Sequence, residues 1–141
     1  MYFKPLLLPL LAQVALTFIV MTTMYRKRIA EFKTKKIHPQ RVSTREKSGP
    51  LLTDSASASD NFSNLFESPV LFYTAILLAL ILLQQDVVIV VLAWIYVALR
   101  YVHSFIHISY NRVMHRFYAF ILSSFVLFAL WMRLGWIIIQ S

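Results

Sequence analysis

The 141-residue sequence contains no cysteine, and this absence removes several classes of site at once. Without a thiol, the chain can form no disulfide, hold no metal through thiolate ligands and use no cysteine nucleophile. Its only glycines are Gly49 and Gly135, so no glycine-rich loop is available to surround a phosphate group. The serines likewise lack the flanking glycines of a nucleophile elbow, which argues against a serine hydrolase.

Acidic residues are also scarce, because 6 Asp and Glu stand against 14 Lys and Arg, for a formal net charge of +8. Proteins that read nucleic acid carry such charge on a soluble module, whereas most of this charge lies in a loop bordered by apolar stretches. We therefore expect no nucleic-acid partner and attribute the charge to membrane topology and anionic lipid. The basic residues of this loop are Arg26, Lys27, Arg28, Lys33, Lys35, Lys36, Arg41, Arg45 and Lys47.

Apolar residues make up 59% of the chain, a proportion that excludes an ordinary soluble domain. Four apolar stretches approach the length of about 20 residues that a helix needs to cross a bilayer. They cover residues 6–24, 64–83, 87–108 and 117–139. The sequence thus predicts an all-α membrane protein, a four-helix antiparallel bundle that forms one domain over residues 1–141, with the lipid bilayer as its partner.

The loops between these stretches predict the topology. The basic loop, residues 25–60, and a second basic turn at residues 110–116 must lie on one side of the membrane, with both termini and the short turn at residues 84–86 on the other. So short a turn makes the second and third spans antiparallel neighbours. The positive-inside rule then predicts a multi-pass protein whose basic loops are cytoplasmic.

A few polar residues interrupt the spans, and they fall at matching depths. Arg100, His103 and His107 recur along one face of the third span, and Asn64 and Glu67 begin the second. An ionisable group in hydrocarbon costs about 2.5 to 3.5 kcal/mol, so these groups should face protein and find partners. A buried Glu67 paired with Arg100 or His103 is predicted, either as a structural ion pair alone or as part of a polar ligand site.

Two further interpretations of the polar face were considered. His103 and His107 have the i, i+4 spacing of a helical metal pair, but no third ligand lies on that face, so no metal site is predicted. Passage of protons or ions along the face is a weaker alternative, because a single polar stripe provides no second gate.

The segment Asn61-Phe62-Ser63-Asn64-Leu65-Phe66-Glu67-Ser68-Pro69, followed by Arg100-Tyr101-Val102-His103, resembles the MAPEG family, the membrane-associated proteins in eicosanoid and glutathione metabolism. The resemblance extends over nearly the whole chain and is strongest to bacterial members. It implies a homotrimer in the bacterial inner membrane, with glutathione as co-substrate between subunits near the cytoplasmic face. The implied activity is a glutathione-dependent transferase or peroxidase that acts on a lipophilic small molecule.

The resemblance also assigns candidate site residues by matching position. Arg26 or Arg28 would meet a carboxylate of glutathione, and Arg112 or Arg116 would stabilise its thiolate by lowering the thiol pKa. The remaining glutathione-binding positions would be Asn64, Glu67, Arg100, His103 and His107.

Two positions depart from the family pattern: Asp60 stands where an arginine is usual, and His107 where a tyrosine is usual. The alternative function is therefore a non-catalytic membrane module of the same fold. In it, Glu67, Arg100 and His103 would form a structural cluster, and the basic loop would bind anionic lipid or a partner.

Overall fold

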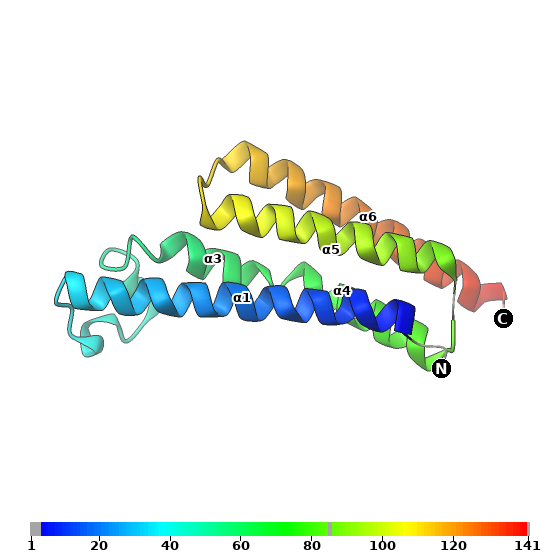
Figure 1. The fold of residues 1–141 in the computed structure, drawn as a ribbon, viewed down its shortest axis with the longest axis horizontal. Coiled ribbons are helices and arrows are strands. Elements are labelled where there is room, and N and C mark those ends of the chain that lie inside the picture. Colours follow the sequence, from blue (N-terminus) through cyan, green and yellow to red (C-terminus); the bar gives the residue numbers. More distant parts are fainter. Residues whose placement is uncertain (1–3, 85, 141) are drawn as a thin grey trace.

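A computed structural model describes residues 4–84 and 86–140, and over these ranges the regular structure is entirely helical. Gln85, in the turn predicted between the second and third spans, lies outside the described residues. The structure contains 4 helical segments that are long and apolar enough to cross a membrane, which confirms the predicted all-α, four-span fold. Both ends of the chain lie at one end of the bundle, and the basic loop lies at the other (Figure 1).

The first span is one long helix, α1 (Lys4–Thr34), which continues well past the apolar stretch that ends at Met24. Its 31 residues extend about 45 Å, more than the hydrocarbon thickness of about 30 Å. The basic residues from Arg26 onward favour helix, so nothing in the sequence ends it at the edge of the apolar stretch. The last turns of α1 thus extend beyond the lipid and support the basic loop.

The second span is divided into α3 (Ala56–Asn64) and α4 (Ser68–Ile81), where the sequence suggested one continuous helix. Pro69 explains the break. Its ring would clash with the carbonyl of Leu65 in an unbroken helix, and it has no N–H to donate to that carbonyl. The break places Asn64 at the end of one helix and Glu67 just before the next.

The third and fourth spans, α5 (Val87–Ile108) and α6 (Val113–Gln140), run side by side along the bundle (Figure 1). Asp86 caps α5, because its carboxylate accepts hydrogen bonds from the N–H groups of Val88 at 2.7 Å and Ile89 at 3.3 Å. The same carboxylate pairs with Arg133 of α6, which holds the pKa of Asp86 below its usual range. This contact ties α5 to α6 at the end of the bundle that carries the termini.

The main apolar core lies between α4, α5 and α6, and Leu6 of α1 joins it. Phe72 of α4 stacks on Tyr96 of α5 with ring centroids 4.7 Å apart, and the hydroxyl of Tyr96 lies 3.2 Å from that of Ser68. Small residues let the helices approach closely around this pair. The buried core residues are Leu6, Phe72, Ala75, Ile76, Ala79, Ile89, Ala93, Tyr96, Val97, Leu127, Leu130 and Leu134.

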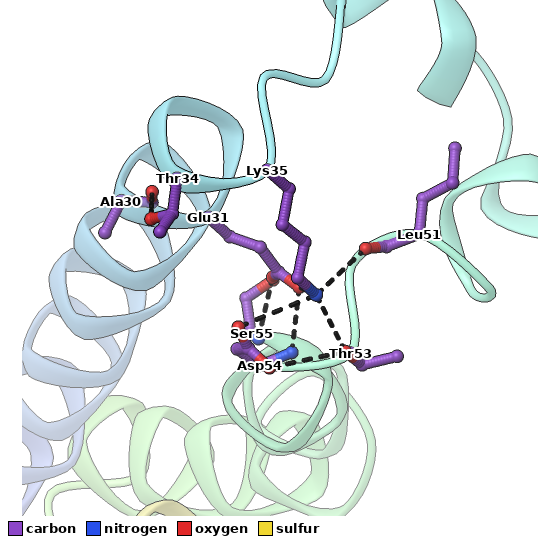
Figure 2. Close-up of polar contacts among 8 residues, drawn as sticks. All are labelled: Ala30, Glu31, Thr34, Lys35, Leu51, Thr53, Asp54 and Ser55. Atoms are coloured by element: carbon purple, nitrogen blue, oxygen red, sulfur yellow. Dashed lines mark hydrogen bonds and ion pairs between the residues drawn. The ribbon is translucent and has the colours of Figure 1, made fainter.

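The basic loop contains the short helices η1 (Pro39–Val42) and α2 (Arg45–Ser48), and a buried carboxylate closes it (Figure 2). Glu31 of α1 accepts hydrogen bonds from the backbone N–H of Asp54 at 2.9 Å and from the N–H and hydroxyl of Ser55 at 3.0 and 2.8 Å. It also pairs with Lys35, and this contact raises the pKa of Lys35. Glu31 therefore joins the end of α1 to the start of α3.

Candidate functional site

A cleft of about 400 Å³ opens between α3, α5 and α6 at the end of the bundle that carries the basic loop. Of the nine site residues predicted from the sequence, five line it: Asn64, Glu67, His103, His107 and Arg116. Asp60, Val113, Phe117 and Phe120 complete the lining. The cleft thus combines charged and imidazole groups with aromatic rings.

Arg116 organises the polar side of the cleft. Its backbone carbonyl lies 2.9 Å from Nδ1 of His103, and its guanidinium Nη1 lies 3.1 Å from Nε2 of His107 and 2.7 Å from Oδ1 of Asn111. These contacts connect α6 to α5, and His107 and Asn111 hold the arginine head group. Arg116 therefore offers a positioned cation to an anionic ligand.

The hydrogen bonds of Arg116 also determine the form of each imidazole. A carbonyl can only accept, so Nδ1 of His103 donates and its Nε2 carries a lone pair. A guanidinium can only donate, so Nε2 of His107 accepts. Nε2 of His103 is buried and has no hydrogen-bond partner among the described residues. His103, which lines the cleft, thus carries an acceptor nitrogen that no described residue satisfies.

Arg100 lies directly behind the cleft and is 0% exposed. Its Nη2 donates to the carbonyl of Asn64 at 3.3 Å, and its Cζ lies 5.7 Å from the centre of the Phe120 ring. Within the described part of the chain, Nε and Nη1 of Arg100 have no hydrogen-bond partner. A buried guanidinium with so few partners keeps most of its positive potential available to the adjoining cleft.

Glu67 does not form the predicted buried ion pair. Its side chain is exposed, and across residues 4–84 and 86–140 no salt bridge joins it to Arg100 or His103. The break before α4 turns Glu67 toward the open cleft, and the backbone of Asn64 becomes the partner of Arg100 instead. The prediction placed Glu67 near the correct partners but assigned it the wrong contact.

The other predicted arginines lie away from this cleft. Arg28 lines a separate cavity beyond the end of the apolar part of α1, Arg26 is exposed, and Arg112 is exposed in the turn between α5 and α6. Of the two arginines predicted to stabilise a thiolate, Arg116 lines the cleft and Arg112 does not.

A buried polar contact beside the cleft was not predicted. Oγ of Ser104 donates to Oδ1 of Asn61 at 3.1 Å and connects α5 to α3 next to Asn64. The sequence did contain a signal for this contact, because Asn61 and Ser104 fall at matching depths in the second and third spans. Among the described side chains, no group of three or more His, Cys, Asp and Glu is placed to hold a metal ion.

Comparison with known proteins gives one positive result. A family model described as the MAPEG family matches residues 6–136, a range that contains all candidate site residues. No match was found among curated proteins or among solved structures.

Proposed function

Because the chain belongs to the MAPEG family, we propose that it is a glutathione-dependent transferase or peroxidase of the membrane that acts on lipophilic substrates. The family in general comprises membrane proteins of glutathione-related transfer and peroxide chemistry. The observation that carries the proposal is the convergence of Arg116, His103 and His107 in one cleft. Such a cleft suits an anionic thiol peptide, because it offers fixed positive charge beside a proton acceptor.

In the proposed reaction, Arg116 stabilises the thiolate of glutathione. Its guanidinium is held by His107 and Asn111, so little reorganisation is needed when the negative charge forms on sulfur. Nε2 of His103 accepts the thiol proton, and the thiolate then forms a bond to the electrophilic atom of the substrate. The bond from that atom to its leaving group breaks, and the leaving group departs with the electron pair and takes up the proton from His103. The positive potential of Arg100 behind the cleft favours the same anion.

The two departures from the family pattern have structural consequences. His107 replaces a tyrosine but orients Arg116 through its Nε2, so the position keeps a role in preparing the cation. Asp60 stands where an arginine is usual and lies at the edge of the cleft. An acidic group there disfavours a carboxylate at that edge, so the carboxylates of glutathione should bind nearer Arg116 and Arg100.

We also propose that the chain assembles as a homotrimer in the bacterial inner membrane, with its basic end cytoplasmic. The basic loop and the turn before α6 lie at the same end, as the positive-inside rule requires (Figure 1). Large apolar side chains cover the outer surface of α6 and suit contact with lipid or a neighbouring subunit. They include Phe117, Leu122, Phe125, Phe128 and Met132.

The test compares Arg116→Gln with Arg112→Gln in the full chain purified in mild detergent. Millimolar glutathione should raise the melting temperature of the wild type, because a ligand of the folded form stabilises it. Arg116→Gln should remove the ultraviolet thiolate absorbance of bound glutathione at neutral pH, and Arg112→Gln should preserve it. If glutathione does not change the melting temperature of the wild type, the proposal is wrong. If Arg112→Gln removes the thiolate absorbance and Arg116→Gln preserves it, the assignment to Arg116 is wrong.

The second candidate function is a non-catalytic membrane module, favoured by the contacts of Arg116 with both His103 and His107. These contacts connect α5 to α6, and in this alternative their only role is to stabilise the packing of the two helices. Under this hypothesis, Arg116→Gln and His107→Ala lower the melting temperature, and glutathione changes it in none of the proteins.

A further inference from the structure

A polar cavity of about 230 Å³ lies between the end of α1, the basic loop and the start of α3. This volume exceeds what a single water molecule or ion requires. Arg28 lines it from α1 and Asp60 from α3, and no salt bridge joins the two in the described structure. The other lining residues are Ser48, Gly49, Leu52, Ser55, Ala56 and Ser59.

One wall of the cavity is held in place by hydrogen bonds, and Arg28 in the cavity has a hydrogen-bond donor without a partner among the described residues. Ser55, in that wall, is held by the buried carboxylate of Glu31 (Figure 2). Nε of Arg28 is buried and has no hydrogen-bond partner among the described residues. The cavity therefore presents one positive and one negative group that do not neutralise each other by direct contact.

An apolar groove of about 410 Å³ runs between α1 and the pair α3 and α4. The hydroxyls of Thr17 and Tyr73 in its wall lie 3.4 Å apart and bond to each other. All its other lining side chains are apolar: Leu10, Val14, Phe18, Met21, Phe62, Leu65, Phe66 and Leu77. The groove thus offers hydrocarbon contact at membrane depth.

The cavity and the groove follow the same helix faces. On α1, Val14 and Met21 of the groove and Arg28 of the cavity are spaced by two helical turns each, which places them on one face. On α3, Ser59 of the cavity and Phe62 of the groove are i, i+3 neighbours. The cavity therefore lies along the same helix faces as the groove, beyond the apolar part of α1, at the depth of the lipid headgroups.

We propose that the cavity and groove together bind one membrane phospholipid whose headgroup carries a phosphate and a primary ammonium, as in phosphatidylethanolamine. The phosphate accepts hydrogen bonds from Arg28, the ammonium donates to Asp60, and an acyl chain fills the groove beside the break between α3 and α4. Asp60 lines both this site and the cleft around Arg116, but Arg28 and the groove lie outside that cleft, and the proposal does not depend on glutathione chemistry.

The choice of headgroup follows from the two charges. Phosphatidylglycerol has no cation for Asp60, which would repel its phosphate. Phosphatidylcholine has a cation but no ammonium N–H, so it cannot donate a hydrogen bond to a carboxylate. Phosphatidylethanolamine offers a phosphate to Arg28 and an ammonium N–H to Asp60, so each charge of its headgroup pairs with the opposite charge of the cavity.

The test uses the full chain in mild detergent with short-chain phosphatidylethanolamine, phosphatidylcholine and phosphatidylglycerol of equal acyl length. Phosphatidylethanolamine should raise the melting temperature by several degrees and more than the other two lipids. Native mass spectrometry should show the same lipid retained on the protein. Asp60→Asn should remove the advantage over phosphatidylcholine, and Arg28→Gln should weaken stabilisation by all three lipids.

Two further variants test binding of the lipid headgroup and binding of the acyl chain separately. Arg26→Gln is the matched control, because Arg26 is exposed, lies on the opposite face of α1 and lines neither cavity nor groove, so its lipid response should equal that of the wild type. Leu77→Trp fills the groove and should reduce the gain from longer acyl chains.

Several results would overturn the proposal, and those on the wild type do not depend on any variant folding. They are equal stabilisation by phosphatidylethanolamine and phosphatidylcholine, stronger stabilisation by phosphatidylglycerol, or an equal effect of phosphoethanolamine without acyl chains. Displacement of the lipid by glutathione would assign the cavity to the peptide instead. A native mass spectrum of a lipid-free oligomer would indicate that a neighbouring subunit covers the groove.

Discussion

Glu31 and Arg100 are both buried charges, at 2% and 0% exposure, but their surroundings differ. Glu31 lies outside the apolar stretch and accepts hydrogen bonds from Lys35, Asp54 and Ser55 (Figure 2). Arg100 lies within the third span, makes one hydrogen bond of 3.3 Å to a carbonyl, and leaves two nitrogens without partners in the described structure.

The difference indicates a structural role for Glu31 and motivates the proposed ligand-binding role of Arg100. A carboxylate whose acceptor sites are filled by its own chain has little left to offer a ligand, so its contacts serve the fold. A guanidinium with unfilled donors in low dielectric costs stability, and such a cost is typical of sites that bind a charged ligand. The contacts of Glu31 therefore stabilise the end of α1, and we propose that the cluster around Arg100 binds an anionic ligand.

Replacement of Glu31 should have the largest effect on stability. Glu31→Met leaves the N–H groups of Asp54 and Ser55 unsatisfied, so we expect a loss of about 3 kcal/mol in the free energy of unfolding. A lower melting temperature and faster protease cleavage in the basic loop would show it. Glu46→Met removes an exposed acid from the same loop and should change stability by less than about 0.5 kcal/mol. Equal effects of the two substitutions would contradict the role of Glu31.

Replacement of Arg100 should change stability little but should abolish the response to glutathione. Arg100→Met keeps an apolar stem of similar length and removes unpartnered donors, so its effect on unfolding should lie within about 1 kcal/mol of zero. The rise in melting temperature with glutathione should nevertheless be lost, because the positive potential behind the cleft is removed. A destabilisation as large as that of Glu31→Met would place Arg100 with the structural charges.

The pair of Asp86 and Arg133 should have the smallest effect and a defined pH dependence. Asp86→Asn keeps the helix cap and removes only the ion pair, so we expect a loss of about 1 kcal/mol or less at neutral pH. The pKa of Asp86 is lowered from 3.8, so the pair stabilises above that pH and is lost as the pH falls through the lowered value. Melting curves of wild type and variant should thus converge below about pH 3.8. A constant difference down to lower pH would exclude the ion pair as its source.

Several features of the fold and site could be predicted, because they depend on residues close together in sequence. The four spans followed from apolar runs of about 20 residues, and the shared face of Arg100, His103 and His107 followed from helical spacing. The break before α4 also had a local signal in Pro69, but the prediction treated the span as continuous.

The contacts of the charged groups could not be predicted in the same way. Glu67 was predicted to pair with Arg100 or His103, yet a backbone carbonyl accepts from Arg100. The buried carboxylate among the described residues is Glu31. Each partner depends on the rotation of a helix about its axis and on the exact end of a helix, and a change of one residue turns a side chain by about 100°.

The sequence by itself determined that this protein lies in the membrane with four spans and a basic end, because hydropathy and charge act additively over each segment. Only the tertiary structure decided which arginine faces the cleft, which carboxylate fastens the loop, and that Arg28 and Asp60 share a cavity. These outcomes depend on hydrogen bonds and packing at distances of a few ångströms between segments far apart in the chain, and local composition does not specify them.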